Sequence, residues 1–120
     1  MYRIYFYRNR RGERPVEEYL KGLEPRHRQK IATRLELLAQ EGPALKRPYA
    51  DVVSGPLREL RIGLGRLEHR ILYYFVVRDA VVLLHAFTKK TQELPRREMD
   101  AALERIKDLN LRLAAGEALT

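Results

Sequence analysis

Four side chains in the second half of the sequence could bind a phosphate and move a proton. Arg61 and Arg70 carry planar guanidinium groups, which bind phosphate oxygens through two parallel hydrogen bonds. Lys89 can contact a phosphate as a point charge. The neutral imidazole of His85 could relay a proton near pH 7, although a strand histidine more often only fills space. Together these residue types predict an anion-binding surface with one candidate proton carrier.

The stretch from residue 57 to residue 87 predicts the strands that position them. Polar and apolar residues alternate along it, and turn-like residues at 65–66 and 78–79 divide it into a three-strand antiparallel meander. These turns place apolar side chains on one face, which we expect to form a core beneath helices: Leu60, Ile62, Ile71, Tyr73, Phe75, Val77, Val82, Leu84 and Ala86. The other face then carries polar and aromatic side chains: Glu59, Arg61, Arg70, Tyr74, His85, Phe87 and Lys89.

The second face admits two interpretations. Arg61 is expected directly opposite Arg70 on the neighbouring strand, where two like charges repel unless an anion lies between them. That anion could be a bound phosphate, with Tyr74 or Phe87 as a platform on which a base stacks. It could also be Glu59, in which case the cluster is an internal ion-pair network.

Other basic residues could extend the contact with phosphate. Lys46 and Arg47 lie in the Pro-containing segment 43–56, which predicts a basic loop without a regular element. Lys90 follows Lys89 and is a further candidate. Of the remaining histidines, His27 is expected on a polar helix surface and His69 on the core side of its strand. Because the histidines share no metal-ligand spacing, we expect neither a metal nor another cofactor.

The elements around the meander are predicted by proline positions and by periodicity. A short aromatic strand is expected over 2–7, and Pro15 and Pro25 each suit the first turn of a helix. Pro95 opens a closing helix in which apolar residues recur at helical spacing as far as residue 113. This order predicts an α+β fold, with two N-terminal helices and one C-terminal helix packed on an antiparallel sheet, in a single domain spanning residues 1–120.

The composition restricts the class of partner and the compartment. A formal net charge of +8 on 120 residues points to a polyanionic partner, either nucleic acid or an acidic protein. The absence of cysteine excludes disulfides and thiolate chemistry and is compatible with a reducing cytoplasm. Because no apolar run is long enough for a signal peptide or a membrane span, we expect a cytoplasmic protein without membrane contact.

Three segments of the second half are informative in this order: residues 57–61 (LRELR), residues 70–74 (RILYY) and residues 83–92 (LLHAFTKKTQ). Taken together and in order, they resemble the HigB-type, phage-derived branch of the RelE/ParE toxin superfamily. Pro95, Glu98, Ala101 and Arg105 match the closing helix of that family. One departure is Leu94, where the family often has a threonine that would cap this helix.

The resemblance implies a RelE-like fold and the toxin of a type II toxin-antitoxin system. Such a toxin is a metal-independent endoribonuclease that cuts mRNA on the ribosome, arrests translation and is neutralised by a helix-turn-helix antitoxin. In that role Arg61 and Arg70 would stabilise charge on the phosphorane, His85 would be the acid or base, and Lys89 would contact the phosphate or the leaving group. Two alternatives remain: a ParE-like inhibitor of DNA gyrase without nuclease activity, and a non-catalytic basic nucleic-acid-binding module.

Overall fold

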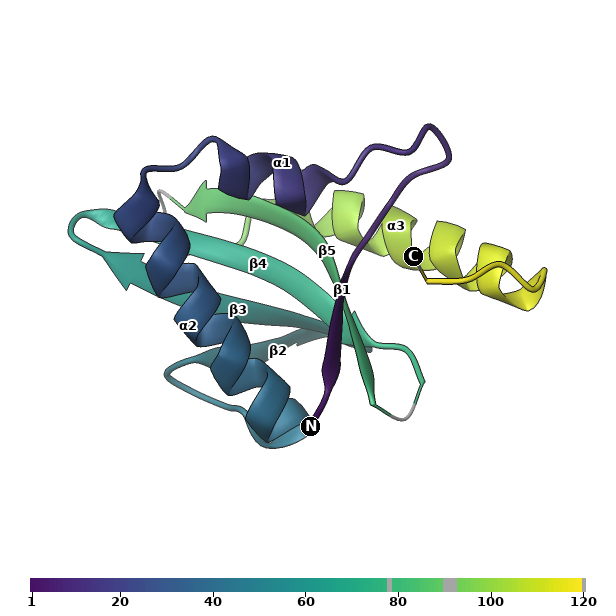
Figure 1. The fold of residues 1–120 in the computed structure, drawn as a ribbon, viewed down its shortest axis with the longest axis horizontal. Coiled ribbons are helices and arrows are strands. Elements are labelled where there is room, and N and C mark those ends of the chain that lie inside the picture. The colour runs from purple at the N-terminus through teal and green to yellow at the C-terminus, as the bar shows by residue number, and fades with distance from the viewer. Residues whose placement is uncertain (78, 90–92, 120) are drawn as a thin grey trace.

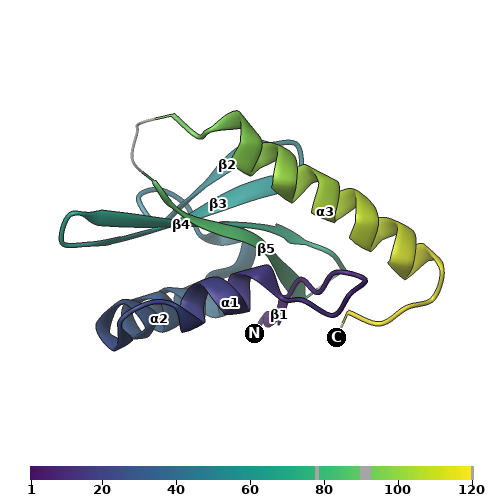
Figure 2. The same cartoon turned by 90° about the horizontal axis from the view of Figure 1, so that it is seen from above.

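Helices cover both faces of a five-stranded sheet (Figure 1). The computed structural model describes residues 1–77, 79–89 and 93–119. Its elements are β1 (Arg3–Phe6), α1 (Pro15–Lys21), α2 (Pro25–Glu41), the 3-10 turn η1 (Gly42–Ala44), β2 (Ala50–Ser54), β3 (Leu57–Leu64), β4 (Leu67–Phe75), β5 (Ala80–Lys89) and α3 (Arg96–Ala114). Viewed along the sheet, α1 and α2 lie on one side and α3 lies on the other (Figure 2).

The strands are ordered β1-β5-β4-β3-β2 across the sheet. The pairs formed by β2, β3, β4 and β5 are antiparallel, whereas β1 runs parallel to β5, so the sheet is mixed. The predicted α+β class, with its meander and three helices, is confirmed. The prediction of no regular element over 43–56 is wrong, because residues 50–54 pair with β3 as an edge strand. Val52 and Val53 favour a strand, but Pro48, Gly55 and Pro56 on either side of this short segment indicate a loop, and the pairing with β3 decides between the two.

The turn at Gly65 gives the predicted register between β3 and β4. Leu64 pairs with Leu67, and Arg61 pairs with Arg70. Gly65 has a φ of 62°, a left-handed conformation that glycine adopts without a steric penalty. The hydrophobic alternation and the turn residue therefore specify the same register.

The pairing of β4 with β5 contains a bulge that the alternation does not predict. Arg70 pairs with Phe87 and Leu72 with His85, as expected, but Tyr73 then pairs with Leu83. Leu84 is therefore an extra residue in β5, and an extra residue reverses the facing of every residue beyond it.

The bulge moves two residues of the predicted core face to the other side of the sheet. Val82 and Leu84 pack with the α3 side, while Val81 and Leu83 pack with the α1 and α2 side. Val77, predicted in the same core, is exposed at the end of the hairpin. The assignment of Val82 and Leu84 was wrong because a one-residue bulge leaves no mark in a continuous apolar run. The assignment of Val77 was wrong because β4 ends at Phe75, before this residue.

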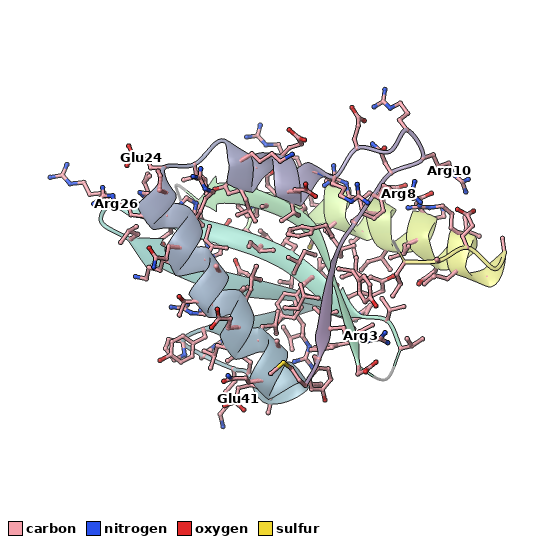
Figure 3. The ribbon with its side chains drawn as sticks, viewed as in Figure 1. Arg3, Arg8, Arg10, Glu24, Arg26 and Glu41 are labelled. Carbon is pink, nitrogen blue, oxygen red and sulfur yellow. The ribbon has the colours of Figure 1, made fainter. Side chains whose placement is uncertain are left out.

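Each face of the sheet has its own hydrophobic core. The α1 and α2 side includes Val16, Ile31, Leu38, Leu60, Ile62, Ile71 and Tyr73. The α3 side includes Leu57, Leu72, Tyr74, Phe87, Ala102, Ile106 and Leu109. Fully burying one such aliphatic side chain contributes about 1.5–3 kcal/mol, so both layers contribute to the stability of the sheet. Exposed charged side chains such as Arg10 and Arg26 project outward (Figure 3). Among the described helices, none is long and apolar enough to cross a membrane.

A chain of polar groups crosses the α1 and α2 side of the sheet. The Nε2 atom of His69 lies 2.9 Å from Nδ1 of His27. The Nδ1 atom of His69 lies 2.6 Å from the hydroxyl of Tyr19, which lies 2.8 Å from the hydroxyl of Thr88. The core position predicted for His69 is confirmed, but His27 is buried rather than on a polar helix surface. Sequence periodicity missed His27 because its burial depends on a hydrogen-bonding partner 42 residues away.

Acidification below about pH 6.5 is expected to destabilise the protein through His69. Burial, with a smaller contribution from His27, lowers the pKa of His69 below its usual value of 6.5. Between the folded pKa and 6.5 the unfolded chain therefore binds more protons than the folded chain, and stability falls as the pH falls. Urea unfolding between pH 5 and 7.5 measures this slope. In His69→Gln the slope should be shallower, and an unchanged slope would contradict the assignment.

Candidate active site and nucleic-acid interface

Arg61 and Arg70 belong to a network of alternating charges on the α3 side of β3 and β4. The Nε atom of Arg70 lies 2.7 Å from Oε1 of Glu59, and its Nη1 atom lies 3.1 Å from Oε1 of Glu68. Arg61 lies 3.4 Å from the other oxygen of Glu59 and 3.3 Å from Asp51. The contact between Arg70 Nε and Glu59 Oε1 is an ion pair without the angles of an aligned hydrogen bond. Glu59 is thus the anion between the two arginines.

The two arginines differ in their access to a ligand. The side chain of Arg70 is 6% exposed and that of Glu59 is 5% exposed, so their pairing is internal to the fold. The side chain of Arg61 is 31% exposed. Since a buried ion pair needs both partners to offset the cost of desolvation, Arg70 supports the fold and holds Glu59 beside Arg61. Arg61 is the arginine of this pair that a phosphate can reach.

His85 lies between two charged side chains of α3, the carboxylate of Glu98 and the guanidinium of Arg105. Its Nε2 atom is 2.8 Å from Oε1 of Glu98, and its Nδ1 atom is 2.8 Å from Nη1 of Arg105. The side chains of His85 and Glu98 are each 17% exposed. Burial lowers the pKa of His85 below its usual value, and the hydrogen bond to Glu98 opposes this shift without cancelling it. His85 is therefore neutral at pH 7.

Glu98 and Arg105 were missed by reasoning from residue chemistry, which used them only as markers of resemblance. They are seven residues apart, so they lie on the same side of α3 as the apolar positions Ala102 and Ile106. A glutamate and an arginine beside an apolar stripe are a signal that they face the sheet rather than solvent. That signal could have paired them with His85.

The two aromatic residues proposed as stacking platforms are covered by α3. Tyr74 is buried, its hydroxyl lies 3.2 Å from Oδ1 of Asn110, and burial raises its pKa to about 12. Phe87 is also buried and stacks on the His85 ring with 5.8 Å between ring centroids. As they stand, neither ring offers an exposed face to a base. The sequence prediction placed both on the correct side of the sheet but did not account for the helix above them.

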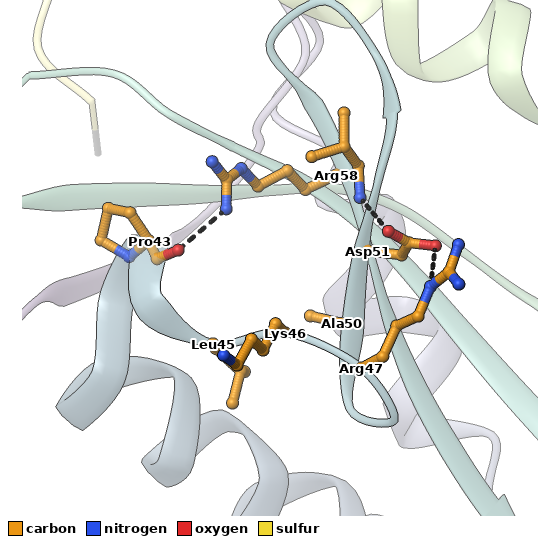
Figure 4. Close-up of a pocket in the computed structure, with 8 residues that line it drawn as sticks. Pro43, Leu45, Lys46, Arg47, Ala50, Asp51 and Arg58 are labelled. Atoms are coloured by element: carbon orange, nitrogen blue, oxygen red, sulfur yellow. Dashed lines mark hydrogen bonds and ion pairs between the residues drawn. The ribbon is translucent and has the colours of Figure 1, made fainter.

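Those of the remaining predicted basic residues that the structure describes lie at two margins of this surface. Lys89 is half-buried at the end of β5, opposite Glu68 on β4, and Lys90 lies outside the described residues. Lys46 and Arg47 line a cavity of about 520 Å³ beside β2, with Arg58 on its far wall (Figure 4).

Asp51 links this cavity to the arginine network. One of its carboxylate oxygens accepts a hydrogen bond of 2.9 Å from Arg47 and another of 3.3 Å from Arg61. The hydrogen bond from Arg47 is the largest of several contacts that lower the pKa of Asp51 below its usual value. The basic loop and Arg61 are therefore parts of one continuous charged surface.

Comparison with known proteins agrees with the resemblance seen in the sequence. Residues 18–107 match the family described as "Phage derived protein Gp49-like (DUF891)". The chain is also similar to "Putative toxin HigB2" of Mycobacterium tuberculosis, with 35% identity over 79 residues that cover 62% of this chain and 39% of the relative. The aligned part is thus about two fifths of that relative's length. These similarities confirm the predicted likeness to HigB-type toxins, and the match over residues 18–107 shows that the chain belongs to the phage-derived Gp49-like family.

Proposed function

We propose that the protein is the toxin of a type II toxin-antitoxin pair and acts as a metal-independent endoribonuclease on mRNA bound to the ribosome. The observation that carries the proposal is the placement of a partly exposed guanidinium, Arg61, on the same sheet face as the His85–Glu98 pair. Family membership and the name of the similar mycobacterial protein support the toxin role. The net charge of +8 supports a polyanionic substrate. The proposed compartment is the cytoplasm.

The chemistry of metal-free RNA cleavage matches these residue types. The ribose 2′-hydroxyl attacks the adjacent phosphorus, so the protein must align the two groups, disperse charge on the phosphorane and move protons. Arg61 and Lys89 would supply the positive charge, because both have side chains that reach solvent. Proton transfer would take place at the His85–Glu98 pair. Lys46 and Arg47 would bind the RNA backbone beside the site.

The proposed antitoxin is a helix-turn-helix protein that covers this basic surface. An acidic segment would be drawn to the loop containing Lys46 and Arg47 and to the neighbouring Arg58 by charge complementarity. Such a contact would weaken with increasing salt, because exposed charges are screened.

Incubating the purified protein with ribosome-bound mRNA, after the protein has been treated with EDTA and the chelator has been removed by dialysis, tests the proposal. A cut message is the expected result. An intact message together with inhibition of DNA gyrase would favour the ParE-like alternative. RNA binding without cleavage and without gyrase inhibition would favour the non-catalytic binding module.

A further inference from the structure

The carbonyl group of Leu84 fixes Arg105 in place. Leu84 is the extra residue of the β5 bulge, and a bulge leaves backbone groups of the extra residue outside the regular ladder. Its carbonyl oxygen accepts a hydrogen bond of 2.9 Å from Nη1 of Arg105. The guanidinium also lies 5.7 Å from the centre of the Tyr7 ring, a distance typical of a cation–π contact. Arg105 is thus held by the Leu84 carbonyl and by the Tyr7 ring, in addition to its contact with His85.

The contact with Arg105 determines where His85 carries its proton. A guanidinium can only donate hydrogen bonds, so Nδ1 of His85, 2.8 Å away, is unprotonated and accepts. A neutral imidazole then carries its hydrogen on Nε2, which donates to Oε1 of Glu98 at 2.8 Å. Both ring nitrogens are engaged, and His85 cannot accept a further proton unless Arg105 is displaced.

These contacts assign the proton acceptor differently from the sequence analysis. We infer that Glu98 accepts the proton of the ribose 2′-hydroxyl, and that His85 and Arg105 are positioning residues that orient its carboxylate. The inference rests on the proposed ribonuclease function. His85 holds one carboxylate oxygen through Nε2–H, Arg105 holds the ring, and the Glu98 side chain, 17% exposed, lies on the same side of the sheet as Arg61.

The cleavage step balances with Glu98 as base. The 2′-oxygen forms a bond to phosphorus as its proton passes to the Glu98 carboxylate. The bond between phosphorus and the 5′-oxygen breaks, its electron pair stays on that oxygen, and water supplies the proton that the leaving oxygen needs. The products are a 2′,3′-cyclic phosphate and a 5′-hydroxyl. Glu98 returns its proton to water once the products leave.

Cleavage of a ribosome-bound mRNA by two isosteric variants tests the assignment. Glu98→Gln keeps the shape but cannot accept the proton, so cleavage should fall by about 10²- to 10⁴-fold. His85→Gln can still donate one hydrogen bond to Glu98 and accept one from Arg105, so the loss should be roughly tenfold, at the low end for a supporting residue. Glu104→Gln, an exposed carboxylate on the same helix, should change cleavage by no more than about twofold.

Two further readouts separate positioning from proton transfer. Nitrogen-15 NMR of the wild-type imidazole should show hydrogen on Nε2 at pH 7, and Arg105→Gln should raise the pKa of His85, because the Arg105 charge contributes to lowering it.

Three results would overturn the inference. They are full activity in Glu98→Gln, a loss in His85→Gln as large as in Glu98→Gln, and hydrogen on Nδ1 in the NMR spectrum. If the wild-type protein cuts no RNA, the ribonuclease function is rejected, and the assignment of a proton acceptor is rejected with it. The NMR experiment would still decide the positioning of His85 by Arg105 in that case.

Discussion

Replacing Arg61 with alanine is expected to reduce mRNA cleavage by about 10²- to 10³-fold, as for the loss of one donor that stabilises a transition-state charge. Arg61 is the partly exposed member of the arginine pair, with a side chain that is 31% exposed, and is therefore the member proposed to contact the phosphate. The fold should persist, because the two carboxylates beside it keep other partners, Asp51 through Arg47 and Glu59 through Arg70. Rates measured with purified variants on ribosome-bound mRNA check this expectation.

The control for Arg61→Ala is Arg61→Lys, which keeps the positive charge but loses the planar guanidinium group and its parallel N–H donors. Its activity should lie between wild type and Arg61→Ala, since an ammonium contacts phosphate as a point charge only. Circular dichroism and thermal unfolding confirm that each variant is folded. A folded Arg61→Ala protein with wild-type cleavage would remove Arg61 from the site.

Replacing Arg70 with alanine is expected to lower the free energy of unfolding by roughly 3–5 kcal/mol, as for breaking a buried ion pair. The substitution leaves the Glu59 carboxylate, 5% exposed, with Arg61 as its ion-pair partner at 3.4 Å. Urea unfolding at neutral pH measures the change.

Two comparisons make the Arg70 result specific. Arg61→Ala removes a more exposed partner of the same carboxylate and should cost no more than about 1 kcal/mol. The double variant Arg70→Ala with Glu59→Gln should recover part of the loss, because the buried charge is removed with its partner. If Arg70→Ala unfolds like wild type, the charge of Glu59 is solvated in some other way and the internal network carries little stability.

The sequence by itself determined the features that depend on neighbours along the chain. Alternation and the glycine at position 65 specify the β3–β4 register, and with it the pairing of Arg61 with Arg70. Pro15 and Pro25, each at the start of a helix, together with the helical periodicity after Pro95, specify α1, α2 and α3. The motifs at 57–61, 70–74 and 83–92 indicate the family, because they can be recognised in the sequence without any knowledge of packing.

Only the tertiary structure decided which of these side chains remain accessible and what they contact. Exposure depends on the element packed above a residue, and α3 covers Tyr74 and Phe87 from a distant part of the chain. The bulge at Leu84 also cannot be predicted from the sequence, because it lies in a run of apolar residues that would suit either face of the sheet. It frees the carbonyl that holds Arg105 against His85. The site therefore arises from contacts between residues 13 to 21 positions apart on different elements, which local periodicity does not encode.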